Sequence, residues 1–237
     1  MNGYVLPPSP VASVAVRGIA DRFPVRRILC VGRNYPAHAR EMGQDPEREA
    51  PFFFSKPADA VIDGGVDVPY PSMTHDFHHE IELVVAIARG GADIAADRAL
   101  EHVYGYGVGV DLTRRDLQTA AKNKGRPWDF AKGFDRSAPI GAIVPAAGIG
   151  HPGKGRIQLT VNGQLRQQGD IADMLWSVPE VIAEASRYIA LAPGDLIFTG
   201  TPAGVAPLLP GDVVVGSVEG VGEVRFRVVG APSPATA

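Results

Sequence analysis

The amino-acid sequence predicts a β-rich domain of the α+β class, and three observations favour it. Apolar runs of strand length recur along the 237 residues, and glycine or proline bounds most of them. The 28 glycines and 21 prolines follow no period, which indicates many turns between short elements. The regular alternation of strand and helix that is typical of a doubly wound sheet is missing. We therefore expect a mixed arrangement that strands dominate, with a few helices.

The strands are expected in the following order. Residues 80–91 form the strongest one and end in a Gly-Gly turn, and residues 103–111 form a glycine-laced strand. Residues 157–170 are expected to be a hairpin, because Asn162-Gly163 favours a tight turn. The other strands are predicted at residues 28–32, 51–62, 195–200, 212–218 and 222–230.

Helices are expected at four places. Residues 34–43 read as a short helix, with Pro36 in its first turn and Gly43 at its end. A second helix is predicted to begin near Asp93, and Thr113 is predicted to cap a third. The second, third and fourth helices cover residues 93–103, 114–124 and 178–191.

Composition limits the domain organisation and the partners. Residues 1–25 are expected to be an arm or a small strand unit, residues 26–230 the main domain and residues 231–237 a flexible tail. The net charge of −3 gives no reason to expect nucleic acid or an anionic membrane as partner. The single cysteine, Cys30, excludes an intrachain disulfide. Because no apolar run is long enough to span a bilayer and no signal peptide is evident, we expect a soluble, cytoplasmic protein.

Glu80 and Glu82 are the first candidates for chemistry. Side chains alternate along a strand, so both carboxylates point to the same face, beside apolar neighbours. Two buried like charges cost several kcal/mol, roughly, unless a cation offsets them. A divalent ion that prefers oxygen ligands would do so. The same spacing also suits a pair of carboxylates at an exposed strand end.

Four further features suit catalysis or binding, and each has a plainer alternative. Asp111 ends a strand and is either a third carboxylate ligand or a helix cap. His38 and Glu41 share a helix face, so they are either a general base with its orienting carboxylate or a surface pair. Lys132 either neutralises buried carboxylates or extends to solvent. The turn at residues 199–204 offers free backbone donors for an anion or is an ordinary turn.

Several familiar catalytic patterns are absent. The sequence has no G-x-S-x-G elbow and no P-loop, and Cys30 lacks the local signature of a nucleophile. His75, His78 and His79 form a cluster that matches no zinc motif, and we interpret them as structural groups or as groups that support the neighbouring site.

Taken together, these stretches resemble the fumarylacetoacetate hydrolase family. The matching segments run in family order from about residue 28 to residue 226: VGRNYPAHAREMG, PFFFSKP, HHEIELVVAIARG, YGYGVGVDLTRRDLQ, WDFAKGFDRSAPIG, LAPGDLIFTGTPAGV, LLPGDVV and VEGVGEV. The resemblance implies the mixed β-sheet roll of the family's C-terminal domain, with a few peripheral helices. Residues 26–230 would then be the catalytic domain.

The resemblance also implies roles for individual residues. It implies one Mg²⁺ or Mn²⁺ per chain, held by Glu80, Glu82 and Asp111. It implies that His38 and Glu41 activate a water molecule. The residues that match a lysine beside the metal and two substrate-contacting positions are Lys132, Gln118 and Thr201.

The activity that the resemblance implies is hydrolysis of a carbon–carbon bond in a small 2-oxo acid. The expected substrate is an acylpyruvate of gentisate-type aromatic degradation, first of all fumarylpyruvate, and the expected assembly is a homodimer. Arg33 is the first candidate to bind the distal carboxylate, with Arg114, Lys122 and Arg126 as alternatives, although each also suits a solvated charge. Oxaloacetate decarboxylation, or another acylpyruvase or isomerase activity on the same scaffold, stays open. A non-catalytic module that only holds a structural ion is the remote alternative.

Overall fold

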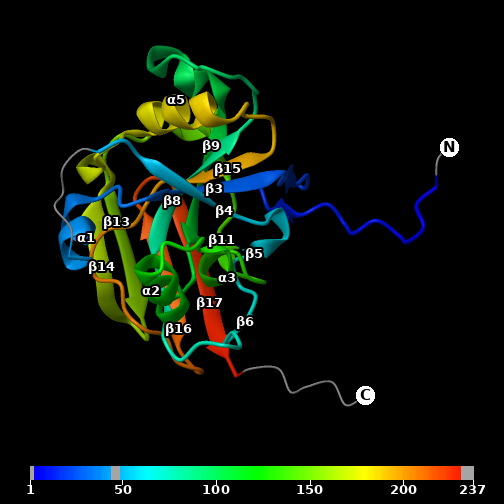
Figure 1. Cartoon of the computed structure of the whole chain (residues 1–237). Coiled ribbons are helices and arrows are strands. Elements are labelled where there is room, and N and C mark those ends of the chain that lie inside the picture. Colours follow the sequence, from blue (N-terminus) through cyan, green and yellow to red (C-terminus); the bar gives the residue numbers. More distant parts are fainter. Residues whose placement is uncertain (1–2, 44–48, 231–237) are drawn as a thin grey trace.

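Two β-sheets hold the main core of the protein between them (Figure 1). The computed structural model describes residues 3–43 and 49–230, so the predicted tail at 231–237 lies outside the described residues. In these ranges the larger sheet has eight strands and the smaller one five. The larger sheet has the order β4 (Phe52–Lys56), β3 (Arg27–Gly32), β15 (Asp195–Phe198), β8 (Ile81–Ile87), β9 (Val103–Val110), β11 (Ala138–Ile140) and β5 (Val61–Asp63), with β12 (Val144–Pro145) paired to β9. The smaller sheet has the order β14 (Gln164–Asp170), β13 (Arg156–Val161), β16 (Val213–Val218), β17 (Gly222–Val229) and β6 (Val68–Pro69).

Both sheets are mixed, as the sequence predicts. The pairs β3–β15, β5–β11 and β6–β17 are parallel, and the other pairs in the two sheets are antiparallel. The predicted hairpin is confirmed, since Asn162 and Gly163 both have positive φ angles of 53° and 77°, which suit a tight turn between β13 and β14. The β-rich α+β class is therefore confirmed.

The α-helices are α1 (Pro36–Glu41), α2 (Arg115–Asn123), α3 (Asp129–Lys132), α4 (Ala146–Ile149) and α5 (Val178–Tyr188). In the view of Figure 1, α1 lies at the left of the molecule and α5 at the top, while α2 and α3 are drawn across the strands. The 3₁₀ helices are η1 (Ala58–Ala60), η2 (Ala96–His102) and η3 (Ile171–Asp173). Among the described residues, no helix is long and apolar enough to cross a membrane.

Two details of the predicted helices are wrong. The segment expected to be a helix from Asp93 is the 3₁₀ helix η2, which begins at Ala96. Asp93 itself has a φ of 47°, outside the right-handed helical region. Thr113 does not cap α2, because it pairs with His78 in the short ladder between β10 (Thr113–Arg114) and β7 (Phe77–His78), and its hydroxyl donates to Asp111 O at 3.2 Å.

Strand β8 is buried on both faces and explains how carboxylates come to lie in the interior. One face, with Ile81, Leu83, Val85 and Ile87, packs into the core between the two sheets. The other face packs against a second cluster. Burying one such aliphatic side chain contributes about 1.5–3 kcal/mol, so the register of β8 is strongly fixed. Glu82 is consequently held in a strand whose seven residues are all buried.

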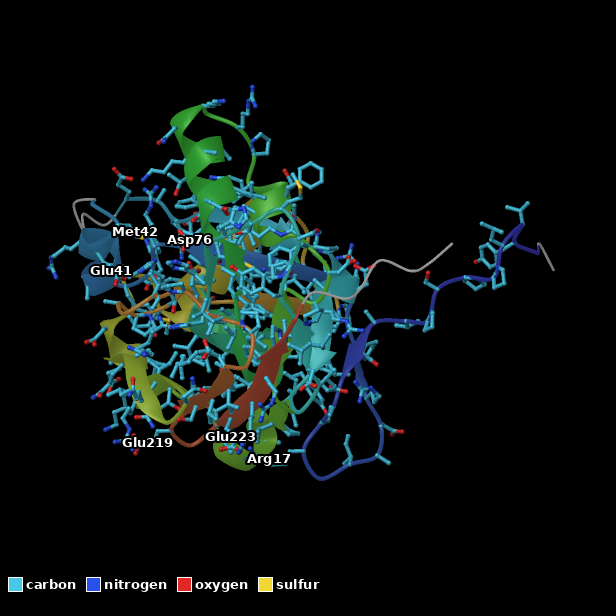
Figure 2. All side chains as sticks on the ribbon, turned by 90° about the horizontal axis from the view of Figure 1, so that it is seen from below. Arg17, Glu41, Met42, Asp76, Glu219 and Glu223 are labelled. Carbon is cyan, nitrogen blue, oxygen red and sulfur yellow. The ribbon has the colours of Figure 1, made fainter. Side chains whose placement is uncertain are left out.

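The N-terminal segment contributes to that second cluster. β1 (Ser13–Val14) and β2 (Phe23–Pro24) pair with each other, and Val14 and Phe23 are buried in the same cluster as residues of β8 and β15. Residues 3–10 are exposed and lead away from the body of the molecule, on the side opposite Glu41 of α1 and the adjoining Met42 (Figure 2). The domain boundary after residue 25 stays a prediction.

Candidate active site

Three carboxylates meet where β8 and β9 lie side by side. Glu80 directly precedes β8, Glu82 is its second residue, and Asp111 directly follows β9. The antiparallel ladder places Glu82 opposite Gly109 and extends through the Asp111 N–H, which donates to Glu80 O at 2.8 Å. One oxygen of each carboxylate lies within 4.8 Å of the others, and all three residues are buried. The alternation of side chains along the strand correctly brings Glu80 and Glu82 together, and Asp111 joins them as the resemblance implies.

Three cationic side chains offset part of this negative charge. Lys132 Nζ lies 2.8 Å from Glu80 Oε2 and 2.7 Å from Asp111 Oδ2. Lys56 Nζ lies 2.7 Å from Asp111 Oδ1, and Arg115 forms an ion pair with Glu80 Oε1. Burial raises the pKa of Glu80, but the charges of Lys132 and Arg115 outweigh it and hold that pKa well below its usual range. Glu80 is therefore ionised.

Glu82 has a different environment from the other two carboxylates. Its Oε2 accepts a hydrogen bond from the Gly200 N–H at 2.7 Å, and the described residues place no cation in ion-pair contact with it. Burial raises the pKa of Glu82 well above its usual value, and the charges of Asp111 and Glu80 raise it further. A cation bound here would offset that effect.

The chemistry of this donor set fits a hard divalent cation. Mg²⁺, Mn²⁺ and Ca²⁺ prefer carboxylate oxygens, and several carboxylates within reach of one point supply them. Glu82, buried beside two like charges, is the group that gains most from such an ion. Glu80, Glu82 and Asp111 are therefore the residues that would hold it.

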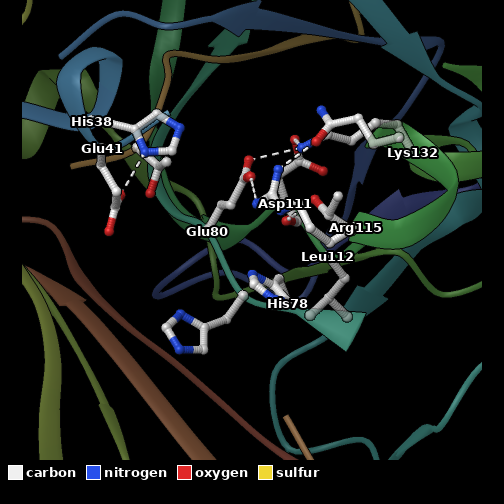
Figure 3. A network of polar contacts seen from close by, with 12 residues as sticks. His38, Glu41, His78, Glu80, Asp111, Leu112, Arg115 and Lys132 are labelled. Atoms are coloured by element: carbon white, nitrogen blue, oxygen red, sulfur yellow. Dashed lines mark hydrogen bonds and ion pairs between the residues drawn. The ribbon is translucent and has the colours of Figure 1, made fainter. Parts of the chain in front are cut away.

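The predicted pair of His38 and Glu41 is in contact. His38 Nδ1 lies 3.0 Å from Glu41 Oε2, and His38 is buried. Pro36, the first residue of α1, fits the first helical turn, where its missing N–H has no partner to lose. Figure 3 shows Glu80 between this pair and the group formed by Lys132, Asp111 and Arg115.

The turn at residues 199–204 links the carboxylates to the His38–Glu41 pair. The Gly200 N–H donates to Glu82 and the Gly204 N–H donates to Glu41 Oε1 at 2.9 Å. Both glycines have left-handed φ angles, 98° and 100°. A Cβ on Gly204 would lie 2.1 Å from Arg166 O, so only glycine fits there.

Five of these side chains line one open pocket, whose volume including solvent is about 500 Å³: His38, Glu80, Glu82, Arg115 and Lys132. Of the residues predicted to contact substrate, Arg33, Gln118 and Thr201 all line it, and so does Lys122. Phe52, Phe54 and Trp128 form an aromatic wall, with ring centroids of both phenylalanines within 5.7 Å of that of Trp128. The residues that line this pocket are Val31, Gly32, Arg33, His38, Met42, Phe52, Phe54, Glu80, Glu82, Arg115, Gln118, Lys122, Trp128, Lys132 and Thr201.

Two of the alternatives for the distal carboxylate lie elsewhere. The Arg114 guanidinium packs over the Phe134 ring at 4.4 Å and donates to Phe130 O at 3.3 Å. Arg126 lines a neighbouring groove beside Phe53 and Ser55. Neither is among the residues that line the pocket, which leaves Arg33 and Lys122.

Sequence reasoning missed Lys56 and Arg115, which bind the carboxylates. Lys56 is 2 % exposed, and its ammonium also donates to Leu112 O and Lys132 O. The signal was a lysine inside the aromatic strand segment FFFSKP, where solvated lysines are rare. Arg115 carried no comparable signal, because TRRDLQ reads as an ordinary charged helix start.

Comparisons with known proteins agree with this architecture. The model of the fumarylacetoacetate (FAA) hydrolase C-terminal family matches residues 27–229. A fumarylpyruvate hydrolase of Ralstonia sp is 43% identical over 184 residues, which is 78% of this chain and 95% of the relative. The oxaloacetate tautomerase FAHD1, mitochondrial, of Mus musculus is 41% identical over 203 residues, 86% of this chain and 91% of the relative. The crystal structure of fumarylpyruvate hydrolase from Pseudomonas aeruginosa in complex with Mn²⁺ and pyruvate is 52% identical, with a TM-score of 0.94 over 96% of this chain and 99% of that one.

The family match covers the two sheets, the three carboxylates and the turn at residues 199–204, and the relatives align over most of their own length. The chain therefore belongs to the fumarylacetoacetate hydrolase family.

Proposed function

We propose that the protein is a metal-dependent enzyme that hydrolyses the carbon–carbon bond of an acylpyruvate, with fumarylpyruvate and water giving fumarate and pyruvate. The observation that carries this proposal is that a buried carboxylate cluster and a His–Glu pair line, or directly support, the same pocket. Hydrolysis of this bond needs two things, a site that stabilises the departing pyruvate unit and a base that activates water.

Glu80, Glu82 and Asp111 would hold Mg²⁺ or Mn²⁺. When bound, such an ion supplies Lewis acidity to the carboxylate and keto oxygens of a 2-oxo acid. The related structure from Pseudomonas aeruginosa, which contains Mn²⁺ and pyruvate, supports this assignment.

His38 and Glu41 would generate the nucleophile. Glu41 accepts from Nδ1 of His38 and thereby leaves Nε2 unprotonated, so that Nε2 can take a proton from water. The hydroxide adds to the C4 carbonyl, and the C3–C4 bond then breaks. Its electron pair passes to C3 as the enolate of pyruvate, which takes up a proton to give pyruvate, while the C4 fragment leaves as fumarate. Lys132, held by Glu80 and Asp111, places a positive charge beside the pocket where oxyanions form.

The charge of the pocket favours a dianionic substrate. Lys56, Lys132 and Arg115 match the three carboxylates in charge, so a bound divalent ion leaves a surplus of positive charge. Fumarylpyruvate carries two carboxylates. Arg33 and Lys122, which also line the pocket, are available to the second one.

Product analysis tests the proposal. The Mn²⁺-loaded protein is incubated with fumarylpyruvate, acetylpyruvate and oxaloacetate, and fumarate and pyruvate are quantified. We expect stoichiometric fumarate and pyruvate from fumarylpyruvate, and the absence of fumarate would reject the proposal. Size measurement in solution tests the homodimer that the resemblance implies.

Oxaloacetate tautomerisation is the second candidate, because the relative from Mus musculus carries that name at 41% identity. Tautomerisation moves a proton and needs no hydrolytic water. His38→Asn should therefore abolish fumarate formation from fumarylpyruvate. Enol–keto exchange of oxaloacetate is measured separately, by absorbance. A wild-type protein that exchanges oxaloacetate rapidly and leaves fumarylpyruvate intact would favour this candidate.

A further inference from the structure

Gln167 on β14 is a fully buried amide that joins the carboxylate strand to the wall of the pocket. Its relative exposure is 0 %. Its Oε1 lies 3.1 Å from the Ile81 N–H, the residue between Glu80 and Glu82. Its Nε2 lies 2.8 Å from Thr201 Oγ1 and 2.8 Å from Pro202 O. One side chain thus contacts β8 and the turn at residues 199–204.

The orientation of this amide follows from its backbone partners. The Ile81 N–H can only donate, so it requires the amide oxygen. The Pro202 carbonyl can only accept, so it requires the NH₂ group. Rotating the amide by 180° would oppose donor to donor and acceptor to acceptor, and that orientation is excluded. His79 Nδ1, 2.8 Å from Oε1, must accordingly carry its proton.

This orientation determines whether the Thr201 hydroxyl donates to Gln167 or accepts from it. The NH₂ group has two protons, and one goes to Pro202 O while the other goes to Thr201 Oγ1. The Thr201 oxygen is therefore an acceptor toward Gln167, and its own proton needs another acceptor. The part of the chain that the structure describes offers none, and Thr201 lines the pocket. The hydroxyl proton is left to a ligand.

We propose that Gln167 is a positioning residue that fixes the Thr201 hydroxyl as a hydrogen-bond donor to an anionic oxygen of the bound 2-oxo acid. This inference rests on the proposed function and adds to it the direction of one substrate contact. The ligand atom opposite Thr201 is then an acceptor, such as a carboxylate, keto or enolate oxygen. A donor group at that position would leave the Thr201 hydroxyl proton without a partner.

A double-mutant cycle tests the proposal with oxalate, a dianion that resembles a 2-oxo acid head. Gln167→Glu replaces the NH₂ group by an oxygen of the same size. As a neutral buried acid its single proton goes to Pro202 O, and the Thr201 hydroxyl then turns to donate to the same oxygen. Binding of oxalate to the Mn²⁺-loaded protein is measured by calorimetry, with KM and kcat for fumarylpyruvate alongside. We expect Thr201→Val and Gln167→Glu each to weaken the binding of oxalate about 10-fold, because each removes a hydrogen bond to a charged group. The double variant should bind no more weakly than Thr201→Val.

Asn34→Asp is the matched control. Asn34 is another buried amide that contacts the same turn, but its side chain donates to Thr199 O and Trp176 O and accepts from the Trp176 N–H. If Asn34→Asp acts only on the shape of the turn, the factor by which it weakens oxalate binding should multiply with the factor for Thr201→Val. Effects of Gln167→Glu and Thr201→Val that multiply in the same way would overturn the proposal.

Further variants keep the test decisive if Gln167→Glu does not fold. Gln167→Met releases the Thr201 hydroxyl instead of reversing it, so a smaller loss of about 3-fold, again absent in the Thr201→Val background, is expected. Thr201→Ser keeps the donor and should bind oxalate within about 3-fold of wild type. Equal binding by Thr201→Ser and Thr201→Val would reject the inference. Failure of the wild-type protein to bind oxalate with Mn²⁺ would instead reject the proposed function.

Discussion

The Gly204 N–H donates to Oε1 of the Glu41 carboxylate at 2.9 Å, while the other oxygen of Glu41 lies 3.0 Å from His38 Nδ1. The carboxylate that orients the imidazole is thus itself oriented by a backbone donor. Gly204 has a φ of 100° and no room for a Cβ, so the position of that donor is set by the turn.

Glu41→Gln should reverse the tautomer of His38. The Gly204 N–H requires the amide oxygen, so the NH₂ group must face Nδ1. Nδ1 then accepts, Nε2 carries the proton, and the imidazole cannot take a proton from water. We expect kcat for fumarylpyruvate to fall by about 10²–10⁴-fold with little change in KM. Steady-state kinetics measures both constants. Glu184→Gln, in the surface pair with Arg187, is the control and should keep wild-type kinetics; an equal loss there would point to a general effect.

Glu82 should make metal binding depend on pH. Burial and the charges of Asp111 and Glu80 raise its pKa, so a divalent ion must displace a proton from it. The affinity for Mn²⁺ should therefore fall as the pH is lowered and rise as it is increased. Calorimetry at two pH values in buffers of different ionisation enthalpy measures both the affinity and the proton released.

Glu82→Gln should remove this proton release and lower the affinity for Mn²⁺ by at least about 10-fold, the range seen when groups around a metal are lost. Glu223→Gln, on the exposed side of β17, is the control. Unchanged Mn²⁺ affinity in Glu82→Gln would show that the ion does not bind at this cluster.

The positions of the three carboxylates could be predicted from the sequence better than those of the cationic side chains that neutralise them, because the former depend on local alternation and the latter on packing. Period-two alternation alone places Glu80 and Glu82 on one face of β8, and the strand that ends at Asp111 pairs with it. Lys56 and Arg115 reach the same cluster from β4 and α2, and that juxtaposition depends on packing among segments far apart in the chain. No local pattern in TRRDLQ distinguishes an arginine that binds a buried carboxylate from one in solvent.

Asp116 should contribute to stability in a pH-dependent way. Its carboxylate accepts from the Thr74 hydroxyl at 2.6 Å and from the N–H groups of His75 and Leu117. Burial raises its pKa, but these hydrogen bonds outweigh that effect and hold the pKa below its usual value. Because the folded pKa is lower than the unfolded one, the stabilisation is present above about pH 4 and is lost as the pH falls through the folded pKa.

Asp116→Asn should therefore lower the free energy of unfolding at pH 7 by about 1 kcal/mol, the typical net value of such bonds. Its stability should also fall less steeply than that of the wild type below pH 4. Urea unfolding between pH 7 and pH 3 measures both, with the exposed Asp21→Asn as control. Parallel pH profiles for Asp116→Asn and wild type would contradict the assignment.

Arg33 should recognise the distal carboxylate of fumarylpyruvate. Its guanidinium lies over the Phe52 ring at 5.1 Å, at the wall of the pocket. Arg33→Met keeps the apolar contact and removes the charge, so we expect KM for fumarylpyruvate to rise about 10-fold. KM for acetylpyruvate, which lacks the second carboxylate, should stay unchanged. Arg126→Met, in the neighbouring groove, should leave both values unchanged, and a rise in KM for both substrates in Arg33→Met would argue against a role in specificity.

Lys56 should contribute more to the stability of the metal-free protein than to that of the metal-bound protein. Its ammonium is buried and lies 2.7 Å from Asp111 Oδ1, and Lys132 neutralises the other oxygen of that carboxylate. Lys56→Met leaves a buried carboxylate partly uncompensated, which typically costs about 3–5 kcal/mol. A divalent ion at the cluster would restore part of the lost positive charge. Thermal unfolding with and without Mn²⁺ should therefore show a larger rise in Tm on metal addition for Lys56→Met than for wild type. The exposed Lys124→Met is the control, and an equal rise in both proteins would mean that Lys56 and the ion do not share the charge of Asp111.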